Sequence, residues 1–218
     1  MQVEIWSDVV CPWCYIGKRR FETALEQFTE AHPDVEVEVA YRSFMLDPNA
    51  PVGESEPVRQ AYEKKFGGPE MAQGILDKVT NEAAGEGVEF NMDIAKRSNT
   101  LLAHRLLVLA ESKGVQLELK ERLLAAYFTE GKAIGETAVL VDEAVAVGLD
   151  RAECEAWLAG DGGRADVAEH LEFAAANGLS SVPTFVFDRR SAVPGAQAPE
   201  LFLQVMEERL TASAAEAE

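Results

Sequence analysis

The amino-acid sequence predicts an α/β fold in which a small mixed β-sheet is split by a large all-helical insertion. Near the start of the chain, a helix lies between two strand-like segments, and near its end two strand-like segments precede a helix. The residues between these groups show helical spacing of apolar residues. We therefore expect an α/β domain built from residues 1–56 and 178–218, and a helical insertion domain of residues 57–177.

The first group of elements is defined by its hydrophobic pattern. Residues 2–6 alternate polar and apolar side chains, and residues 35–41 do so strictly, as half-buried strands do. Between them, apolar residues recur at helical spacing over residues 12–31. Pro12 suits the first turn of that helix, and Pro33 marks its end.

The insertion and the final group follow from helix caps and helix breakers. Gly or Asn follows most of the helical segments, and capping residues precede several of them. Strand character returns at residues 184–188, with residues 191–193 as the hairpin partner. The expected helices are residues 58–66, 69–84, 99–113, 117–129, 136–147, 150–160, 164–176 and 200–210.

Cys11 and Cys14 lie where the first strand passes into the first helix. The free N–H groups and positive dipole end of a helix favour an anion, so we expect a thiolate at Cys11 with a lowered pKa. Cys14 follows three residues later, and one helical turn brings its sulfur close to that of Cys11. The pair therefore predicts a reversible disulfide, with Cys11 as the attacking thiol and Cys14 as the resolving thiol.

Three other interpretations of the pair have weaker support. A structural zinc site needs four ligands, and only Cys154, His32, His104 and His170 remain, so we expect no metal. A purely structural disulfide would close a very short loop and stabilise the fold little. Two inert thiols would not need a proline between them at a helix start. Cys154 is expected to be a half-buried apolar residue, with a redox partner as the alternative.

Composition restricts the partners and the location. The formal net charge of −18, with a pI of about 4.6, would repel nucleic acid and anionic membranes, so we expect neither as a partner. No apolar run reaches the length of a membrane span and no secretory signal precedes the first strand, so the expected location is the cytoplasm. The basic residues 18–20 lie close to Cys11; a solvated helix face is expected, and attraction of an acidic substrate is the alternative.

Several motifs, in order along nearly the whole chain, resemble the DsbA-like branch of the thioredoxin superfamily. Within that branch they are similar to the cytoplasmic FrnE-type thiol–disulfide oxidoreductases. The motifs are DVVCPWCYIG at residues 8–17, NTLLAHR at residues 99–105, VPTFVF at residues 182–187 and GAQ at residues 195–197. The resemblance implies a thioredoxin fold, β-α-β followed by β-β-α, with a large helical insertion.

The resemblance also implies a set of site residues around the redox pair. Pro12 and Trp13 complete the active-site motif. Pro183 would be a cis proline packed against the pair, which leaves the Val182 backbone free to pair with an extended substrate peptide. Without the resemblance, a trans proline at the first residue of a strand is the simpler interpretation.

Four further polar residues are candidates on the same basis. Asn99, His104 and Arg105 lie on the helix that the family places beside the cysteines. His104 would contact substrate or donate a proton, or else be a satisfied histidine at a helix-packing surface. Asp8 would accept a proton from Cys14, or else cap a turn as a loop carboxylate.

We therefore expect an enzyme that exchanges disulfides through its own dithiol and has no tightly bound cofactor. Its partners would be protein or small-molecule thiols and disulfides, and it would be a monomer or a homodimer. The same thiol–disulfide exchange could also isomerise disulfides. The first alternative is a glutathione-dependent isomerase or transferase, related to 2-hydroxychromene-2-carboxylate isomerase and kappa-class glutathione transferase, with glutathione as co-substrate. Such relatives commonly have Ser in place of Cys11. The second alternative is a peptide-binding holdase.

Overall fold

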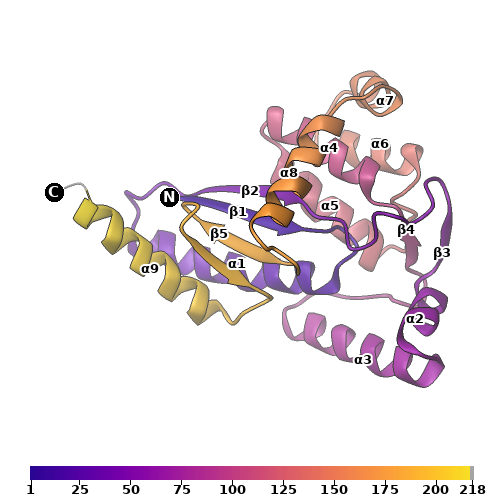
Figure 1. The fold of residues 1–218 in the computed structure, drawn as a ribbon, viewed down its shortest axis with the longest axis horizontal. Helices are drawn as coiled ribbons and strands as arrows, with labels where there is room; N and C mark the ends of the chain where they lie inside the picture. Colours follow the sequence, from indigo (N-terminus) through magenta and orange to yellow (C-terminus); the bar gives the residue numbers. More distant parts are fainter. Residues whose placement is uncertain (217–218) are drawn as a thin grey trace.

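A four-stranded sheet lies at the centre of the α/β part of the computed structural model, which describes residues 1–216 (Figure 1). The strand order is β2-β1-β5-β6, with β1 parallel to β2 and the other neighbours antiparallel. The strands are β1 (Gln2–Ser7), β2 (Glu38–Ser43), β5 (Thr184–Phe187) and β6 (Ser191–Pro194). The predicted α/β fold with a helical insertion is confirmed.

The second strand lies further along the chain than predicted, at Glu38–Ser43 instead of residues 35–41. Its register explains the difference, because Glu38 pairs with Gln2 at the very start of β1. The alternation before Glu38 has no partner strand opposite it. A strand needs a hydrogen-bonding neighbour as well as a suitable pattern.

Two long helices cover one face of the sheet, α1 (Pro12–Ala31) and α9 (Pro199–Glu216) (Figure 1). Phe21 of α1 packs against Phe185 of β5, and Phe202 of α9 packs on the same ring, at centroid distances of 5.3 and 4.4 Å. These fully buried rings join the start of the chain to its end. Because each aromatic side chain buries a large apolar area, this layer stabilises the split sheet.

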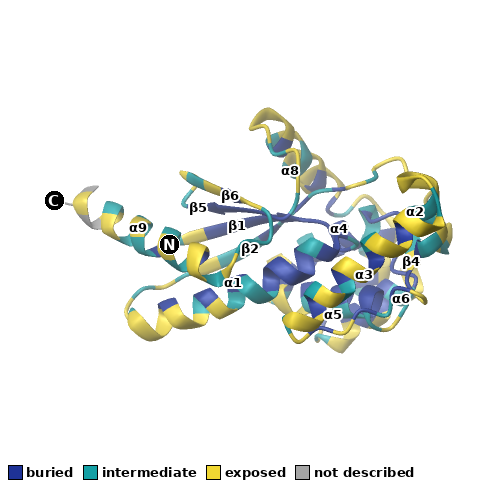
Figure 2. Cartoon of the chain, turned by 90° about the horizontal axis from the view of Figure 1, so that it is seen from below, coloured by how far each residue is buried: buried dark blue, intermediate teal, exposed yellow. Residues whose placement is uncertain are grey.

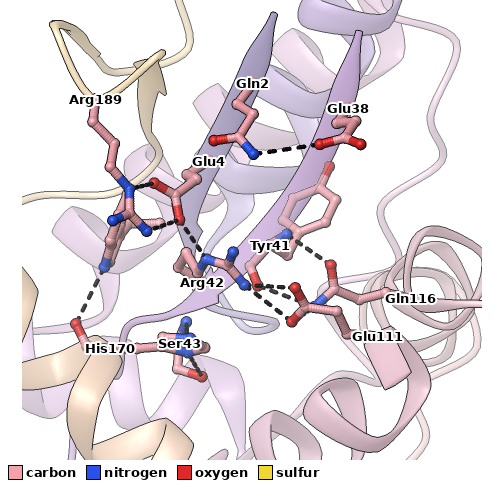
Figure 3. Close-up of polar contacts among 11 residues, drawn as sticks. Gln2, Glu4, Glu38, Tyr41, Arg42, Ser43, Glu111, Gln116, His170 and Arg189 are labelled. Carbon is pink, nitrogen blue, oxygen red and sulfur yellow. Dashed lines mark hydrogen bonds and ion pairs between the residues drawn. The ribbon is translucent and has the colours of Figure 1, made fainter. Parts of the chain in front are cut away.

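The opposite face is covered by α8 (Arg164–Ala176), whose Phe173 stacks on Trp6 of β1 at 5.0 Å. Polar groups reinforce this contact, as Figure 3 shows. Glu4, buried in β1, forms ion pairs with Arg42 of β2 and Arg189 of the β5–β6 turn. Burial opposes ionisation of Glu4, but its hydrogen bonds and ion pairs with these arginines lower its pKa. The network joins β1, β2 and the β5–β6 turn.

The inserted helices pack around a second, larger apolar core that is rich in leucine (Figure 2). A short antiparallel pair, β3 (Ser55–Pro57) and β4 (Lys96–Ser98), was not predicted, because three residues around a proline show no alternation. The division into two domains at residues 57 and 177 stays a prediction. The helices are α2 (Val58–Phe66), α3 (Pro69–Gly85), α4 (Leu101–Ser112), α5 (Gln116–Phe128), α6 (Thr137–Ala146) and α7 (Arg151–Ala159).

Within the described residues, no helix is both long enough and apolar enough to cross a bilayer. The last helix extends past the predicted residue 210 to Glu216, and Ala217 and Glu218 lie outside the described residues.

Candidate active site

The two cysteines occupy the junction between β1 and α1. Cys11 is the N-cap residue of α1, with an extended backbone at φ −88° and ψ 115°, and Pro12 begins the helix. The amide of Cys14 donates a 3.0 Å hydrogen bond to the carbonyl of Cys11, which closes the first turn. Both side chains are free thiols, and they are only 4% and 2% exposed. The predicted strand-to-helix placement of the pair is therefore observed.

The loop that precedes β5 lies directly against Cys11. The Cys11 sulfur is 3.6 Å from the carbonyl oxygen of Val182, and the Val182–Pro183 peptide bond is cis. Gly17 of α1 makes this approach possible, because a Cβ atom there would lie 3.0 Å from Cγ of Pro183. Residues at opposite ends of the chain thus form one wall of the site.

The two thiols share their titration. Burial raises the pKa of Cys14, but the hydrogen bond from Cys11, the charge of Lys120, the Ser7 hydroxyl and the Asp8 amide together lower it. The pKa of Cys11 is raised well above its usual value by its hydrogen bond to Cys14 and by burial. The pair therefore loses a first proton readily and a second with difficulty.

The expected thiolate at Cys11 stays a prediction, and the hydrogen-bonded pair shares one thiolate between its two sulfurs. Besides the helix terminus, the charge of a buried lysine, Lys120, favours the thiolate form of Cys14. In this arrangement Cys11 is the hydrogen-bond donor of the pair, and Cys14 is the acceptor.

Lys120 of α5 is the site residue that the sequence analysis missed. Its side chain is fully buried, and within residues 1–216 its Nζ atom makes no hydrogen bond. The ammonium lies 5.0 Å from the ring centroid of Tyr41. Burial lowers the pKa of Lys120 to about 8, although the charges of Cys14 and Asp8 oppose this shift. No sequence motif marks this lysine, because an isolated Lys in a helix ordinarily faces solvent.

Asp8 and His104 form a buried pair behind the cysteines. His104 Nε2 lies 3.2 Å from Asp8 Oδ1, and the Leu46 amide donates a 2.8 Å hydrogen bond to Asp8 Oδ2. Burial favours the neutral acid, but the hydrogen bond and charge of His104 lower the pKa of Asp8. Both oxygens of Asp8 therefore have partners, and its backbone amide, rather than its carboxylate, is directed to Cys14.

The structure places Asn99 and Arg105 away from the thiols. Asn99 spans the turn before α4, donating to the carbonyl of Ala50 at 2.7 Å and accepting from the amide of Leu101 at 2.9 Å. The guanidinium of Arg105 donates to four carbonyls at the end of α7 and in the α7–α8 connection, at 2.6 to 3.3 Å, namely those of Trp157, Leu158, Gly160 and Gly162. Both side chains hold backbone segments in place, and neither contacts the pair.

The active-site motif has a partly exposed aromatic residue beside the thiols. Trp13 lies under Lys78 of α3, whose Nζ is 5.8 Å from the ring centroid. Pro12 is buried. Cys154 is buried in the helical block among apolar residues, which agrees with the predicted apolar role.

The basic residues 18–20 do not form the solvated face that was expected. Lys18 is almost fully buried and forms an ion pair with Glu121 at 2.6 Å. Arg20 binds two carboxylates of α3, Glu82 at 2.9 Å and Glu86 at 2.6 Å. These pairs attach α1 to the helical block, which the sequence did not indicate because their partners are distant along the chain.

Comparisons with known proteins agree with this geometry. The chain is 37% identical to a probable DsbA oxidoreductase of Streptomyces coelicolor, whose structure has been solved. The two structures superpose with a TM-score of 0.89, over 95% of this chain and 89% of the other. The cytosolic disulfide reductase DsbM of Pseudomonas aeruginosa, solved with GSH, shares the fold at 20% identity, with a TM-score of 0.67 and coverages of 97% and 100%.

A sequence relative and a family model complete the comparison. The uncharacterized protein YwbO of Bacillus subtilis strain 168 is 28% identical over 204 residues, which is 93% of this chain and 94% of YwbO. The model of the DSBA-like thioredoxin domain matches residues 2–207. The chain therefore belongs to the DsbA-like thioredoxin domain family.

Proposed function

We propose that the protein is a cytoplasmic dithiol–disulfide oxidoreductase of the DsbA and FrnE type, with Cys11 as nucleophile and Cys14 as resolving thiol. One observation carries the proposal: two free thiols share the start of α1, and one of them faces the Val182 carbonyl of the cis-proline loop. Family membership supports it. The direction of exchange depends on the reduction potential of the pair.

The first step uses the hydrogen bond between the two sulfurs. The Cys14 thiolate accepts the proton of Cys11 as the Cys11 sulfur attacks a substrate disulfide, R–S–S–R′. An S–S bond forms between Cys11 and R–S, and R′–S⁻ leaves with the electron pair of the broken bond. Cys14 thus serves as the base for Cys11.

The second step releases the other half of the substrate. Cys14 gives its proton to the departing thiolate R′–S⁻, and the positive charge of Lys120 stabilises the resulting Cys14 thiolate. This thiolate attacks the Cys11 sulfur, so that a Cys11–Cys14 disulfide forms and R–S⁻ leaves. The dithiol loses two electrons, the substrate disulfide gains two, and the reverse sequence oxidises a substrate dithiol.

The Val182 backbone provides a place for an extended substrate. Its carbonyl lies beside the Cys11 sulfur, and its amide makes no hydrogen bond to another described residue. A peptide strand around a substrate disulfide would pair with these groups, as in other strand-addition complexes.

The test is a single-turnover reaction of the reduced protein with a protein disulfide and with hydroxyethyl disulfide. We expect two thiols to be lost from the protein per disulfide reduced, no reduction by Cys11→Ser, and an unchanged rate for Cys154→Ser. Full activity in Cys11→Ser would overturn the proposal. Activity that requires glutathione and survives in Cys14→Ser would instead favour the glutathione-dependent isomerase or transferase.

A further inference from the structure

A pocket of about 480 Å³ lies beside the cysteine motif, between α2 and the loops that follow β1 and β2. Val10, the residue before Cys11, forms part of its wall. This volume falls within the usual range for sites that bind small molecules. The mechanism above uses none of the other side chains that line the pocket, and the apolar ones include Leu46, Val58 and Phe66.

Two tyrosines face this pocket with unused hydroxyl groups. Tyr127 is 98% buried, and neither it nor Tyr62 makes a side-chain hydrogen bond within residues 1–216. Neither hydroxyl is among the fully enclosed buried polar atoms, so both are open to the pocket. Tyr15, by contrast, donates its hydroxyl to Glu121 at 2.6 Å. Both hydroxyls are therefore available to donate a hydrogen bond to an acceptor on a ligand in the pocket.

Both hydroxyls lie within electrostatic reach of the nucleophile. Burial raises the pKa of Tyr62 to about 12, and the charge of Cys11 adds to the shift. Burial likewise raises the pKa of Tyr127, with contributions from Tyr62, Asp8 and Cys11. Both tyrosines therefore stay protonated at neutral pH and can donate a hydrogen bond to a group that enters beside the cysteine motif.

The rim of the pocket is positively charged on a strongly acidic protein. Lys64 and Arg97 both pair with Glu56, and Arg97 also pairs with Asp47. Lys65 lies 5.6 Å from the Phe66 ring and forms no ion pair with a described residue. One cation at the rim is thus free to attract a carboxylate, although the chain as a whole carries −18.

We propose that this pocket is the substrate-specificity site, and that it binds the leaving half of a small aromatic disulfide that carries a carboxylate. The apolar wall contacts the ring, Lys65 attracts the carboxylate, and the Tyr62 and Tyr127 hydroxyls donate hydrogen bonds to the departing thiolate. Val10, the neighbour of Cys11 in the chain, lines the pocket, so a leaving group held there lies next to the cysteine motif. The proposal rests on the function proposed above and names its substrate class.

In the reaction, the attacking Cys11 sulfur bonds to one sulfur of the substrate while the S–S bond of the substrate breaks. The electron pair of that bond stays on the aryl thiolate, which receives two hydrogen bonds from the tyrosines until it takes the proton of Cys14. The two tyrosines neither gain nor lose a proton in this step. Their effect is therefore confined to substrates whose leaving group occupies the pocket.

The test compares two substrates in single-turnover reactions of the reduced protein: 5,5′-dithiobis(2-nitrobenzoate) and hydroxyethyl disulfide. We expect Tyr62→Phe and Tyr127→Phe each to lower the second-order rate constant for the aromatic substrate about tenfold, and to change the rate for the aliphatic one less than twofold. Tyr15→Phe, whose hydroxyl is outside the pocket, is the matched control. Lys65→Gln should weaken the preference for the charged aromatic substrate over uncharged 4,4′-dithiodipyridine.

Equal rates in wild type and both Tyr→Phe variants would overturn the proposal, and so would an equal loss with both substrates. A second measurement does not depend on thiol chemistry: calorimetric binding of 4-(methylthio)benzoate, which has no disulfide. Weaker binding by both variants supports the pocket even if the disulfide reaction fails, whereas absence of binding to wild type contradicts it. If the proposed function is wrong, the wild-type protein will not reduce hydroxyethyl disulfide.

Discussion

The sulfur of Cys11 lies 3.6 Å from the carbonyl oxygen of Val182, although 171 residues separate the two along the chain. The contact exists because β1 and β5 are neighbours in the sheet and Gly17 lets α1 approach Pro183. The residues between them fold as a helical block that adds one further group to the site, the buried amine of Lys120. The predictions below test these parts separately.

Replacing the resolving cysteine should trap the intermediate. In Cys14→Ser, the Cys11 mixed disulfide forms but lacks an internal thiol to break it, so we expect a stable covalent adduct. Intact-protein mass spectrometry after exposure to a disulfide measures it. Cys11→Ser should carry no adduct at this site under the same conditions. An adduct on Cys14 instead would reverse the assigned roles.

Lys120 should control the acidity of the thiol pair. Its positive charge lowers the pKa of Cys14, so Lys120→Met should raise the first apparent thiol pKa by about one unit. Thiolate absorbance at 240 nm, followed against pH in the reduced protein, measures this value. Lys113→Met, at an exposed ion pair with Glu153, is the control and should leave it unchanged. If Lys120 had only a structural role, Lys120→Met would leave the first apparent thiol pKa unchanged.

The same lysine should reduce stability at neutral pH. Its pKa is lowered to about 8 from the usual 10.5, so the unfolded chain binds more protons between these values. Stability of the oxidised protein should therefore rise as pH increases from about 8 to 10.5, and Lys120→Met should remove that rise. At pH 7 the variant should be more stable by roughly 1–3 kcal/mol in urea unfolding, because a buried ammonium is removed. A less stable variant would contradict this account.

Asp8 should make the folded protein sensitive to acid. Its pKa lies below the usual 3.8, so the unfolded chain takes up a proton first as pH falls. The stability that Asp8 provides is therefore complete above about pH 5 and is lost at lower pH. Asp8→Asn should flatten the fall in stability between pH 5 and 3, measured by urea unfolding. Asp93→Asn, which is 80% exposed, should follow wild type.

Arg105 should affect the stability of the fold and not the rate of thiol–disulfide exchange. Its guanidinium satisfies four carbonyls at the end of α7 and in the α7–α8 connection. Arg105→Met leaves these groups unpaired and should cost about 2–4 kcal/mol of unfolding free energy. The thiol pKa and the single-turnover rate of the folded fraction should stay at wild-type values. Arg164→Met, at an exposed pair with Asp161, serves as the control for stability.

The parts of the molecule that were predictable are those with local causes. The cysteine pair, its position at a helix start and most helices follow from residues within a turn or two of one another. Asp150 illustrates this, since its side chain caps α7 through the amide of Glu153 at 2.8 Å, as its position before the helix indicates. Local signals of this kind need no knowledge of the tertiary structure.

The parts that were missed depend on packing between distant segments. Lys120 and Lys18 resemble surface residues in their helices, and only the contact between α1, α5 and β2 encloses them. Arg105 matched a motif near the site, yet its side chain extends to a connection 52 to 57 residues later. The effect of Lys120 on the thiol pair was missed for the same reason, because this cation comes from α5.

A redox titration of the Cys11–Cys14 pair tests the central claim most directly. The protein would be equilibrated in glutathione buffers of known potential, acid-quenched and alkylated, and the fraction with both thiols free read by mass spectrometry. We predict one reversible two-electron transition at a potential between about −120 and −270 mV, absent in Cys11→Ser and intact in Cys154→Ser. A pair that stays fully reduced or fully modified by glutathione, with no internal disulfide at any potential, would contradict the proposed dithiol chemistry.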